Sequence, residues 1–329
     1  VTGMEPITPW LPILFVASLL LGSLSYHVVE QPFRRGVRFN RKFVFSSSAA
    51  TASFLALVSF VGLLRDGFET RFSAEVVSLD KARSPAIPYV HCDNRAAGAW
   101  CSLGSESATP QTLLWGDSHM LAWAPALNHV LVQRGESGIL VELAACPPLI
   151  GVTGNSARRD CPASSLFVRN YLQSHPEIKT VVMAGYWSTY FREDGPLQIG
   201  ARKGISAVGG ALADTVDWLR VNGKQVILIG PVPVYDKSVP LAQALEVASQ
   251  RKLLHSTADQ QRIKHAPFYE VVAAARPGPS FRFLDPVQWM CSSECITMKD
   301  GVTLYRDSNH LSVAGVEALL EQLAVGVEL

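Results

Sequence analysis

The chain has 329 residues, which is enough for about two domains. Its formal net charge is +1, so it lacks the strong positive field that attracts nucleic acid, and we expect no nucleic-acid partner. Hydrophobic residues make up 48% of the chain and are concentrated in two long apolar stretches near its start. The remainder has the composition of a domain that folds in water.

The two apolar stretches, residues 7–29 and 43–64, are each close to the roughly 20 residues that a helix needs to cross a bilayer. A buried helical hairpin of a soluble protein is the alternative. The segment between them, 31–42, argues against that alternative because it holds four arginines, one lysine and no acid. The positive-inside rule places such a loop in the cytoplasm. We therefore expect two membrane crossings and an extracytoplasmic region after Leu64.

The chain begins with Val1, and no basic segment precedes the first apolar stretch. A secretory signal peptide is therefore not expected. Because the first helix would start outside the cytoplasm, we expect this chain to be the tail of a longer protein that crosses the membrane several times.

Six cysteines lie in the region expected outside the cytoplasm, and an even number in an oxidising compartment predicts disulfides. Six cysteines allow 15 pairings, of which we favour the pairing of sequence neighbours. A zinc site is the alternative, but the spacings contain no CxxC and no histidine at ligand spacing, so we expect no metal. The favoured pairs are Cys92 with Cys101, Cys146 with Cys161 and Cys291 with Cys295.

Residues 65–111 read as a connector of mixed character, with one short helix at 72–81. From residue 112 onward, short apolar runs alternate with amphipathic segments. This alternation predicts a parallel sheet with helices on both faces, whose functional groups lie at the carboxyl ends of the strands. Strands are expected at 112–115, 138–143, 180–184, 225–229 and 280–284, and helices at 121–133, 164–174, 205–222, 242–255 and 313–323.

One motif follows the first of these strands, in the sequence Thr-Leu-Leu-Trp-Gly-Asp-Ser-His from Thr112. Gly116 permits a tight turn, and Ser118 falls at the start of the next helix. Free backbone N–H groups and the helix dipole at that position favour a developing oxyanion, which suits a nucleophilic serine. The alternative is that Asp117 and Ser118 only cap the helix.

A second motif near the C-terminus reads Asp-Ser-Asn-His-Leu-Ser from Asp307. Asp307 and His310 are three residues apart, so both side chains can lie on one side of the chain. Asp307 can then accept the Nδ1 proton of His310 and leave Nε2 to take the proton of Ser118. A capping aspartate and a surface histidine before the final helix form the alternative. Together the two motifs supply the groups needed for acyl transfer through an acyl-enzyme.

The pair of motifs resembles the SGNH (GDSL) hydrolase superfamily. In addition, Ser-Tyr-His-Val-Val-Glu-Gln-Pro-Phe-Arg at 25–34 resembles the end of the last helix of a membrane acyltransferase-3 (AT3) domain. Cys291-x-x-x-Cys295, Tyr305-Arg306-Asp307 and His310-Leu311-Ser312 are similar to the fused AT3–SGNH proteins that O-acetylate bacterial surface polysaccharides.

This resemblance implies an α/β fold, namely an SGNH-like three-layer α/β/α parallel sheet preceded by two transmembrane helices. It divides the chain into the last helix of an AT3 domain (1–33), a cytoplasmic basic loop (34–42), an additional transmembrane helix (43–64), a periplasmic linker (65–111) and the SGNH acyl-transfer domain (112–329). It also implies a location in the bacterial inner membrane, with the catalytic domain in the periplasm.

Carried over to this sequence, the resemblance implies Ser118 as nucleophile, His310 as base and Asp307 as the group that orients the base. It also implies an oxyanion hole made by the amides of Ser118 and Gly185. The family's Gly-x-Asn-Asp block has as its nearest match Gly-Tyr-Trp-Ser at Gly185, without the asparagine. Backbone donors, the N–H of Trp187 and Ser188 are the candidate replacements.

The resemblance further implies that acetyl-CoA in the cytoplasm is the ultimate donor and that upstream AT3 helices carry the acetyl group across the membrane. Ser118 would pass the group to a hydroxyl of a cell-envelope polysaccharide such as O-antigen or lipopolysaccharide. We expect this domain itself to bind no cofactor. The alternatives are an esterase that deacetylates polysaccharide with the same triad, and a non-catalytic glycan-binding module. Four aromatic residues could stack on sugars or pack in the core: Trp115, Trp123, Trp187 and Tyr190.

Overall fold

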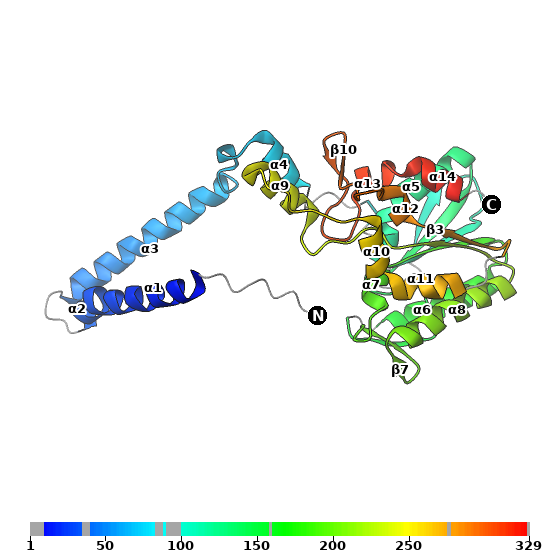
Figure 1. Cartoon of the computed structure of the whole chain (residues 1–329), viewed down its shortest axis with the longest axis horizontal. Coiled ribbons are helices and arrows are strands. Elements are labelled where there is room, and N and C mark those ends of the chain that lie inside the picture. Colours follow the sequence, from blue (N-terminus) through cyan, green and yellow to red (C-terminus); the bar gives the residue numbers. More distant parts are fainter. Residues whose placement is uncertain are drawn as a thin grey trace. The chain divides into compact units, whose positions relative to one another are not determined.

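The computed structural model describes residues 10–34, 40–82, 88–89, 100–157, 160–274 and 278–327 (Figure 1). The chain divides into two compact units, Val1–Phe72 and Ser73–Leu329. The first holds the apolar helices, and the second holds the sheet and both chemical motifs.

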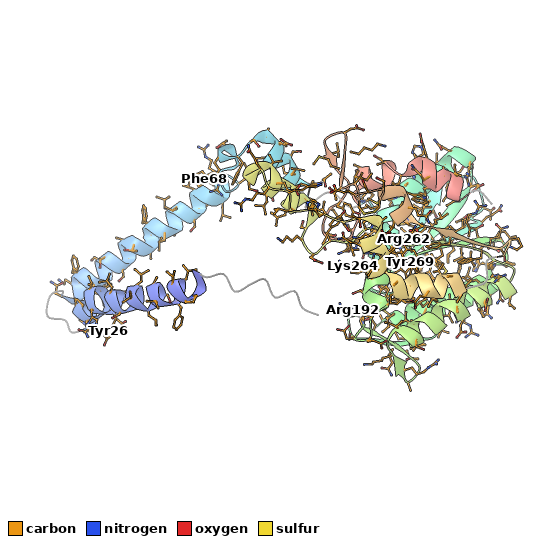
Figure 2. The ribbon with its side chains drawn as sticks, in the orientation of Figure 1. Tyr26, Phe68, Arg192, Arg262, Lys264 and Tyr269 are labelled. Carbon is orange, nitrogen blue, oxygen red and sulfur yellow. A yellow bond between two sulfur atoms is a disulfide. The ribbon has the colours of Figure 1, made fainter. Side chains whose placement is uncertain are left out.

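In the first unit, α1 (Trp10–Ser25) passes through a π-helical turn (Tyr26–Glu30) into α2 (Gln31–Arg34), and α3 spans Arg41–Leu64. The segments Pro12–Glu30 and Arg41–Leu64 are long and apolar enough to cross a membrane, and none of either segment is buried. Figure 2 shows their side chains extending outward from the helices. The two predicted apolar stretches are thus two helices, whereas residues 35–39 of the basic loop lie outside the described residues.

The second unit is built on a six-stranded sheet with the order β1-β3-β2-β5-β8-β9. Five strands are parallel, and the edge strand β1 runs antiparallel to β3. The predicted α/β class is confirmed, but the sheet is mixed rather than wholly parallel. The strands are β1 (Cys101–Gly104), β2 (Thr112–Gly116), β3 (Ser137–Glu142), β5 (Thr180–Ala184), β8 (Gln225–Ile229) and β9 (Phe281–Leu284).

Strand β1 comes from the stretch that the sequence assigned to the connector 65–111. It has four residues, and only Leu103 among them is buried, so it carries too short an apolar pattern to be recognised. Its backbone pairing with β3 nevertheless makes it part of the sheet.

Helices cover both faces of the sheet, and β2 shows why. Leu114 packs into one apolar cluster, while its neighbours Leu113 and Trp115 pack into the other, because successive strand side chains point to opposite faces. The first cluster includes α5 (Ser118–Arg134), α13 (Val313–Glu317) and α14 (Leu320–Gly326), and the second includes α6 (Cys161–Ser174), α8 (Ile205–Val221) and α11 (Ala266–Ala274). The result is the expected three-layer arrangement (Figure 1).

Several elements differ from the sequence-based boundaries. The final helix, expected at 313–323, is broken into α13 and α14, and the helix expected at 242–255 ends at Ser249, where Gln250 adopts a left-handed conformation. A small sheet in the order β4-β6-β7 and a β10-β11 hairpin were not predicted. The remaining elements are α4 (Ala74–Lys81), α7 (Trp187–Tyr190), α9 (Val239–Ser249), α10 (Ala258–Lys264), α12 (Pro286–Met290), a 3-10 turn (Glu69–Arg71), β4 (Val152–Asn155), β6 (Leu197–Ile199), β7 (Arg202–Lys203), β10 (Met298–Lys299) and β11 (Val302–Thr303).

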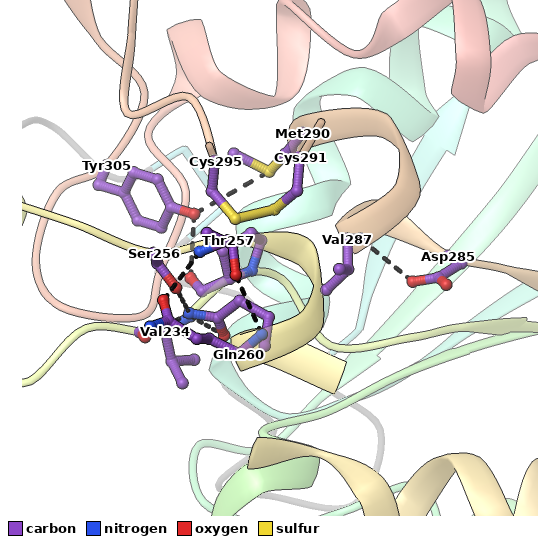
Figure 3. The surroundings of a disulfide bond; sticks show 12 residues. Val234, Ser256, Thr257, Gln260, Asp285, Val287, Met290, Cys291, Cys295 and Tyr305 are labelled. Atoms are coloured by element: carbon purple, nitrogen blue, oxygen red, sulfur yellow. Dashed lines mark hydrogen bonds between the residues drawn. A yellow bond between two sulfur atoms is a disulfide. The ribbon is translucent and has the colours of Figure 1, made fainter. Parts of the chain in front are cut away.

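Two of the three favoured disulfides are present, Cys146–Cys161 and Cys291–Cys295. Cys101 is also in a disulfide, and its favoured partner Cys92 lies outside the described residues. Figure 3 shows the Cys291–Cys295 bond at the end of α12.

Candidate active site

Ser118 is presented by the turn that joins β2 to α5. The ladder between β2 and β5 pairs Gly116 with Ala184, and a Cβ on Gly116 would lie 2.0 Å from the carbonyl oxygen of Ala184. Only glycine fits there, so the close approach of the two strands requires it. Asp117 then caps α5 by accepting the amide of His119 at 2.8 Å, which leaves Ser118 as the first helical residue.

The second motif meets this serine, although 192 residues separate them in the chain. Ser118 Oγ lies 2.8 Å from His310 Nε2, and His310 Nδ1 lies 2.7 Å from Asp307 Oδ2. The side chain of His310 is 16% exposed and that of Asp307 42% exposed. The structure therefore brings together all three residues that the sequence put forward for acyl transfer.

Asp307 is held as a carboxylate. Burial raises its pKa, but hydrogen bonds from the ring and amide of His310 and from the amide of Asn309 outweigh burial and hold the pKa well below its usual value. An ionised Asp307 accepts the proton on Nδ1, which leaves Nε2 without a proton and facing Ser118 Oγ. This arrangement can remove the proton of the serine as its oxygen attacks a carbonyl carbon.

Asp117 organises the floor of the site. Its side chain is fully buried, and besides capping α5 it accepts the amide of Tyr186 at 2.8 Å and the hydroxyl of Tyr190 at 2.5 Å. Burial raises the pKa of Asp117 more than these hydrogen bonds lower it. The side chain therefore connects the turn after β2 to the segment after β5. The sequence analysis predicted only that Asp117 caps the helix.

Two backbone amides are placed to form an oxyanion hole. Because Gly116 and Ala184 are paired, the next residues Asp117 and Gly185 lie side by side, and a Cβ on Gly185 would be 3.5 Å from Asp117 Oδ2. Among the described residues, the amides of Ser118 and Gly185 have no acceptor. Both can therefore donate to an oxyanion that forms next to Ser118 Oγ.

The suggested replacement of the family asparagine by Trp187 is wrong. Trp187 is fully buried, its indole N–H donates to the carbonyl of Ile229 at 2.8 Å, and its amide donates to the carbonyl of Gly185. Neither N–H is available to a substrate. The hydroxyl of Ser188 is likewise engaged, at 3.2 Å from His265 Nδ1.

His119 forms a bridge between the two motifs. Its Nε2 atom lies 3.2 Å from Asn309 Oδ1, and its ring lies 4.8 Å from Tyr186 and 4.4 Å from His310. Burial, followed by the charge of His310, lowers the pKa of His119 well below its usual value, so the ring is neutral and can donate from Nε2. The sequence analysis assigned no role to His119 or to Asn309.

The four aromatic residues offered for sugar stacking belong to the core, because none is more than 2% exposed: Trp115, Trp123, Trp187 and Tyr190. Tyr186 is instead the half-buried aromatic residue beside the site. Within the described part of the chain, no three His, Cys, Asp or Glu side chains are grouped to hold a metal ion.

Comparison with known proteins identifies the domain. A family model described as the SGNH domain fused to AT3 domains matches residues 89–324. That span begins ahead of the boundary at 112 that the sequence suggested and includes β1. No curated protein matches the chain.

Solved structures are similar at low sequence identity. The periplasmic domain of the lipopolysaccharide acetyltransferase of Salmonella ser. Paratyphi A has a TM-score of 0.50 and 15% identity, covering 67% of this chain and 84% of that one. TesA has a TM-score of 0.39 and 14% identity, covering 66% and 97%. A GDSL-like lipase from Bacteroides thetaiotaomicron has a TM-score of 0.36 and 13% identity, covering 65% and 87%. The first of these likenesses shows a shared fold.

Proposed function

The chain belongs to the family of SGNH domains fused to AT3 domains, and from that premise we propose that it transfers acetyl groups, through an ester on Ser118, to hydroxyls of a bacterial cell-envelope polysaccharide. The observation that carries the proposal is the pair of hydrogen bonds that joins Ser118 to His310 and His310 to Asp307. The similar lipopolysaccharide acetyltransferase domain supports the choice of acceptor.

In the first step, His310 Nε2 takes the proton of Ser118 as Oγ attacks the acetyl carbonyl carbon. The amides of Ser118 and Gly185 donate to the oxyanion of the tetrahedral intermediate. The intermediate collapses to acetyl-Ser118, and His310 returns the proton to the leaving group. Asp307 stays ionised and stabilises the charged ring throughout.

In the second step, a sugar hydroxyl takes the place of the leaving group. His310 removes the hydroxyl proton, the sugar oxygen attacks the acetyl carbon, and the ester bond to Ser118 breaks. The proton passes through His310 to Ser118 Oγ. The acetyl group reaches Ser118 from acetyl-CoA by way of upstream AT3 helices, in a protein anchored in the inner membrane with this domain in the periplasm. Two apolar helices ahead of the domain support that placement.

Hydrolysis is the second candidate, because 42% of the Asp307 side chain is exposed and water can approach the triad. The same groups would then deacetylate an acylated polysaccharide. The two activities differ in the final acceptor, so the exclusion of water and the binding of the sugar decide between them.

The test uses the full chain in detergent with p-nitrophenyl acetate as an artificial donor. Nitrophenolate release gives the rate of acylation, and mass spectrometry of the intact protein detects acetyl-Ser118. We expect one acetyl group per chain and its transfer to a deacetylated cell-envelope polysaccharide. Ser118→Ala should lower the rate by about 10⁶-fold. Ser174→Ala, an exposed serine on α6, is the matched control and should leave the rate unchanged.

Acetyl-Ser118 that transfers to the polysaccharide more slowly than it hydrolyses would favour the esterase. An unchanged rate in Ser118→Ala would contradict both candidates, because each requires an acyl-enzyme on that residue.

A further inference from the structure

A cleft of about 520 Å³ lies beside the last strand of the sheet, bounded by β9 and α12 on one side and by α14 on the other. Trp289 lines it and is half-buried, while Gln288, Glu321 and Gln322 line it and are exposed. Asp285, only 7% exposed, also lines it. None of the three triad residues is part of its lining, so it is separate from the active site.

The helix that carries Trp289 and Gln288 is held at both ends (Figure 3). At its start, Asp285 Oδ1 accepts the amide of Val287 at 3.1 Å and the hydroxyl of Tyr269 at 2.8 Å. Directly after its end, Cys291 is joined to Cys295 by a disulfide. Side chains on such a fixed element meet a ligand without first losing the freedom of their backbone.

We propose that this cleft binds a neutral segment of the polysaccharide acceptor at a distance from Ser118, an inference that rests on the proposed function. A sugar presents apolar C–H faces together with hydroxyls that both donate and accept. The indole of Trp289 offers an apolar surface, and the amides of Gln288 and Gln322 offer both a donor and an acceptor. The indole can therefore contact the C–H face of a sugar ring while the two amides bond to its hydroxyls.

Charge selects a neutral segment over an anionic one. The lining contains two acids, Asp285 and Glu321, and no lysine or arginine. The Nη1 group of Arg282 donates to the carbonyls of Val325 and Gly326 and is not itself part of the lining. Within the lining, a phosphate or a uronic acid would meet two acids, whereas hydroxyls can donate to both carboxylates.

The position of the cleft suits a polymer rather than a single sugar. Strands β5 and β8 separate β9 from β2, so three strand spacings, about 14 Å, lie between the strand that leads to Ser118 and the strand that leads to Asp285. Since these four strands are parallel, both residues follow the same edge of the sheet. Trp289 also contacts Trp123 of α5, with ring centroids 6.3 Å apart.

The test measures binding separately from catalysis, in Ser118→Ala full chain in detergent. The probe is cell-envelope polysaccharide from cells that make the protein, freed of acetyl esters with mild alkali and separated into neutral and anionic fractions. Trp289→Ala and the double variant Gln288→Ala/Gln322→Ala are compared with Gln173→Ala, an exposed glutamine on α6. The double variant replaces exposed side chains only, so it tests the cleft even where loss of Trp289 disturbs packing.

We expect the double variant to bind the neutral fraction about tenfold more weakly, which is about 1.4 kcal/mol, and the control to bind it normally. With Ser118 restored, the double variant should acetylate a single-sugar methyl glycoside at the normal rate and show a raised KM only for the polymer. Normal binding by both cleft variants, or binding confined to the anionic fraction, would overturn the proposal. Failure of the proposed function would appear differently, as the absence of acetyl-Ser118.

Discussion

The two halves of the candidate triad are fixed by different physical means. Ser118 stands on a turn set by regular main-chain structure, because β2 pairs with β3 on one side and β5 on the other and α5 begins at the serine. Asp307 and His310 stand on a loop that belongs to no helix or strand. Even the exposure differs, since Asp117 in the turn is fully buried whereas 42% of the Asp307 side chain is exposed.

The loop is held by main-chain bonds and also by its own catalytic carboxylate. Asp307 Oδ1 accepts the amides of Asn309 and His310, while the carbonyl of Asp307 accepts the amide of Val239. The turn thus keeps its shape whether or not the serine reacts, but the loop uses one side chain both for shape and for chemistry. Substitutions in the two segments should separate these effects.

Among substitutions that keep the nucleophile Ser118, the largest effect is expected in the loop. Asp307→Asn keeps an oxygen for the two amides, but its amide nitrogen cannot accept the Nδ1 proton of His310. The ring of His310 then carries its proton on Nε2, which can no longer accept the proton of Ser118. The acylation rate with p-nitrophenyl acetate should therefore fall by about 10⁴-fold. The melting temperature checks that the variant is folded, since the ionised Asp307 side chain also contributes to stability. A loss below tenfold would show that Asp307 does not set the tautomer.

In the turn, Gly116→Ala should lower the stability of the domain rather than act directly on the acylation rate. The new Cβ would lie 2.0 Å from the carbonyl oxygen of Ala184 and 2.7 Å from Cβ of Met120, so strand or helix must shift. We expect a loss of about 4 kcal/mol in the free energy of unfolding, measured in urea. Gly210→Ala is the control, because its Cβ on α8 would meet nothing within 4 Å and should be neutral or stabilising. Equal stability of the two variants would contradict the argument.

The contrast between turn and loop also explains what the sequence could predict. The turn follows from local rules, since an apolar run, a glycine and a capping aspartate in this order predict a strand, a tight turn and the start of a helix. Even there, the helix was expected from residue 121, three residues later than its start at Ser118. The pairing of Asp307 with His310 could likewise be read from their spacing.

What the sequence could not show depends on contacts between distant residues. The bond from Tyr190 to Asp117 joins residues 73 apart, and that from His119 to Asn309 joins residues 190 apart. Asn309 stands beside His310 in the motif, but no local pattern indicates where its side chain points. The break before Leu320 in the final helix was missed for a different reason, because the apolar pattern of the sequence continues through it.

Two buried histidines, His119 and His265, should make the domain less stable in acid before Asp307 is protonated. Burial, followed by the charge of Lys264, lowers the pKa of His265 to about 4, and burial lowers the pKa of His119 in the same direction. The unfolded chain, with a histidine pKa of about 6.5, then binds more protons than the folded chain, so stability falls as pH drops from about 6.5 toward 4. Asp307, whose pKa is depressed, loses its contribution only below about pH 4.

His265 accounts for at most about 3 kcal/mol of this loss. Urea unfolding at about pH 7 and about pH 4.5 measures it, and His265→Gln should flatten the dependence. An unaltered protein that is equally stable at both values would contradict the assignment.

The smallest effect should come from the bridge between turn and loop. His119→Ala removes the hydrogen bond to Asn309 and the ring contact with His310, so the two motifs are free to separate slightly. We expect a fall of about tenfold in the kcat of acylation with KM unchanged, because the alignment of Ser118 with His310 is affected rather than binding. His119→Phe keeps an aromatic ring and loses only the hydrogen bond, so its kcat should lie between those of the unaltered protein and His119→Ala. In a double-mutant cycle, the kcat of the double variant His119→Ala/Asn309→Ala should be no lower than that of the slower single variant. If instead the two fold-losses in kcat multiply, the two residues act independently.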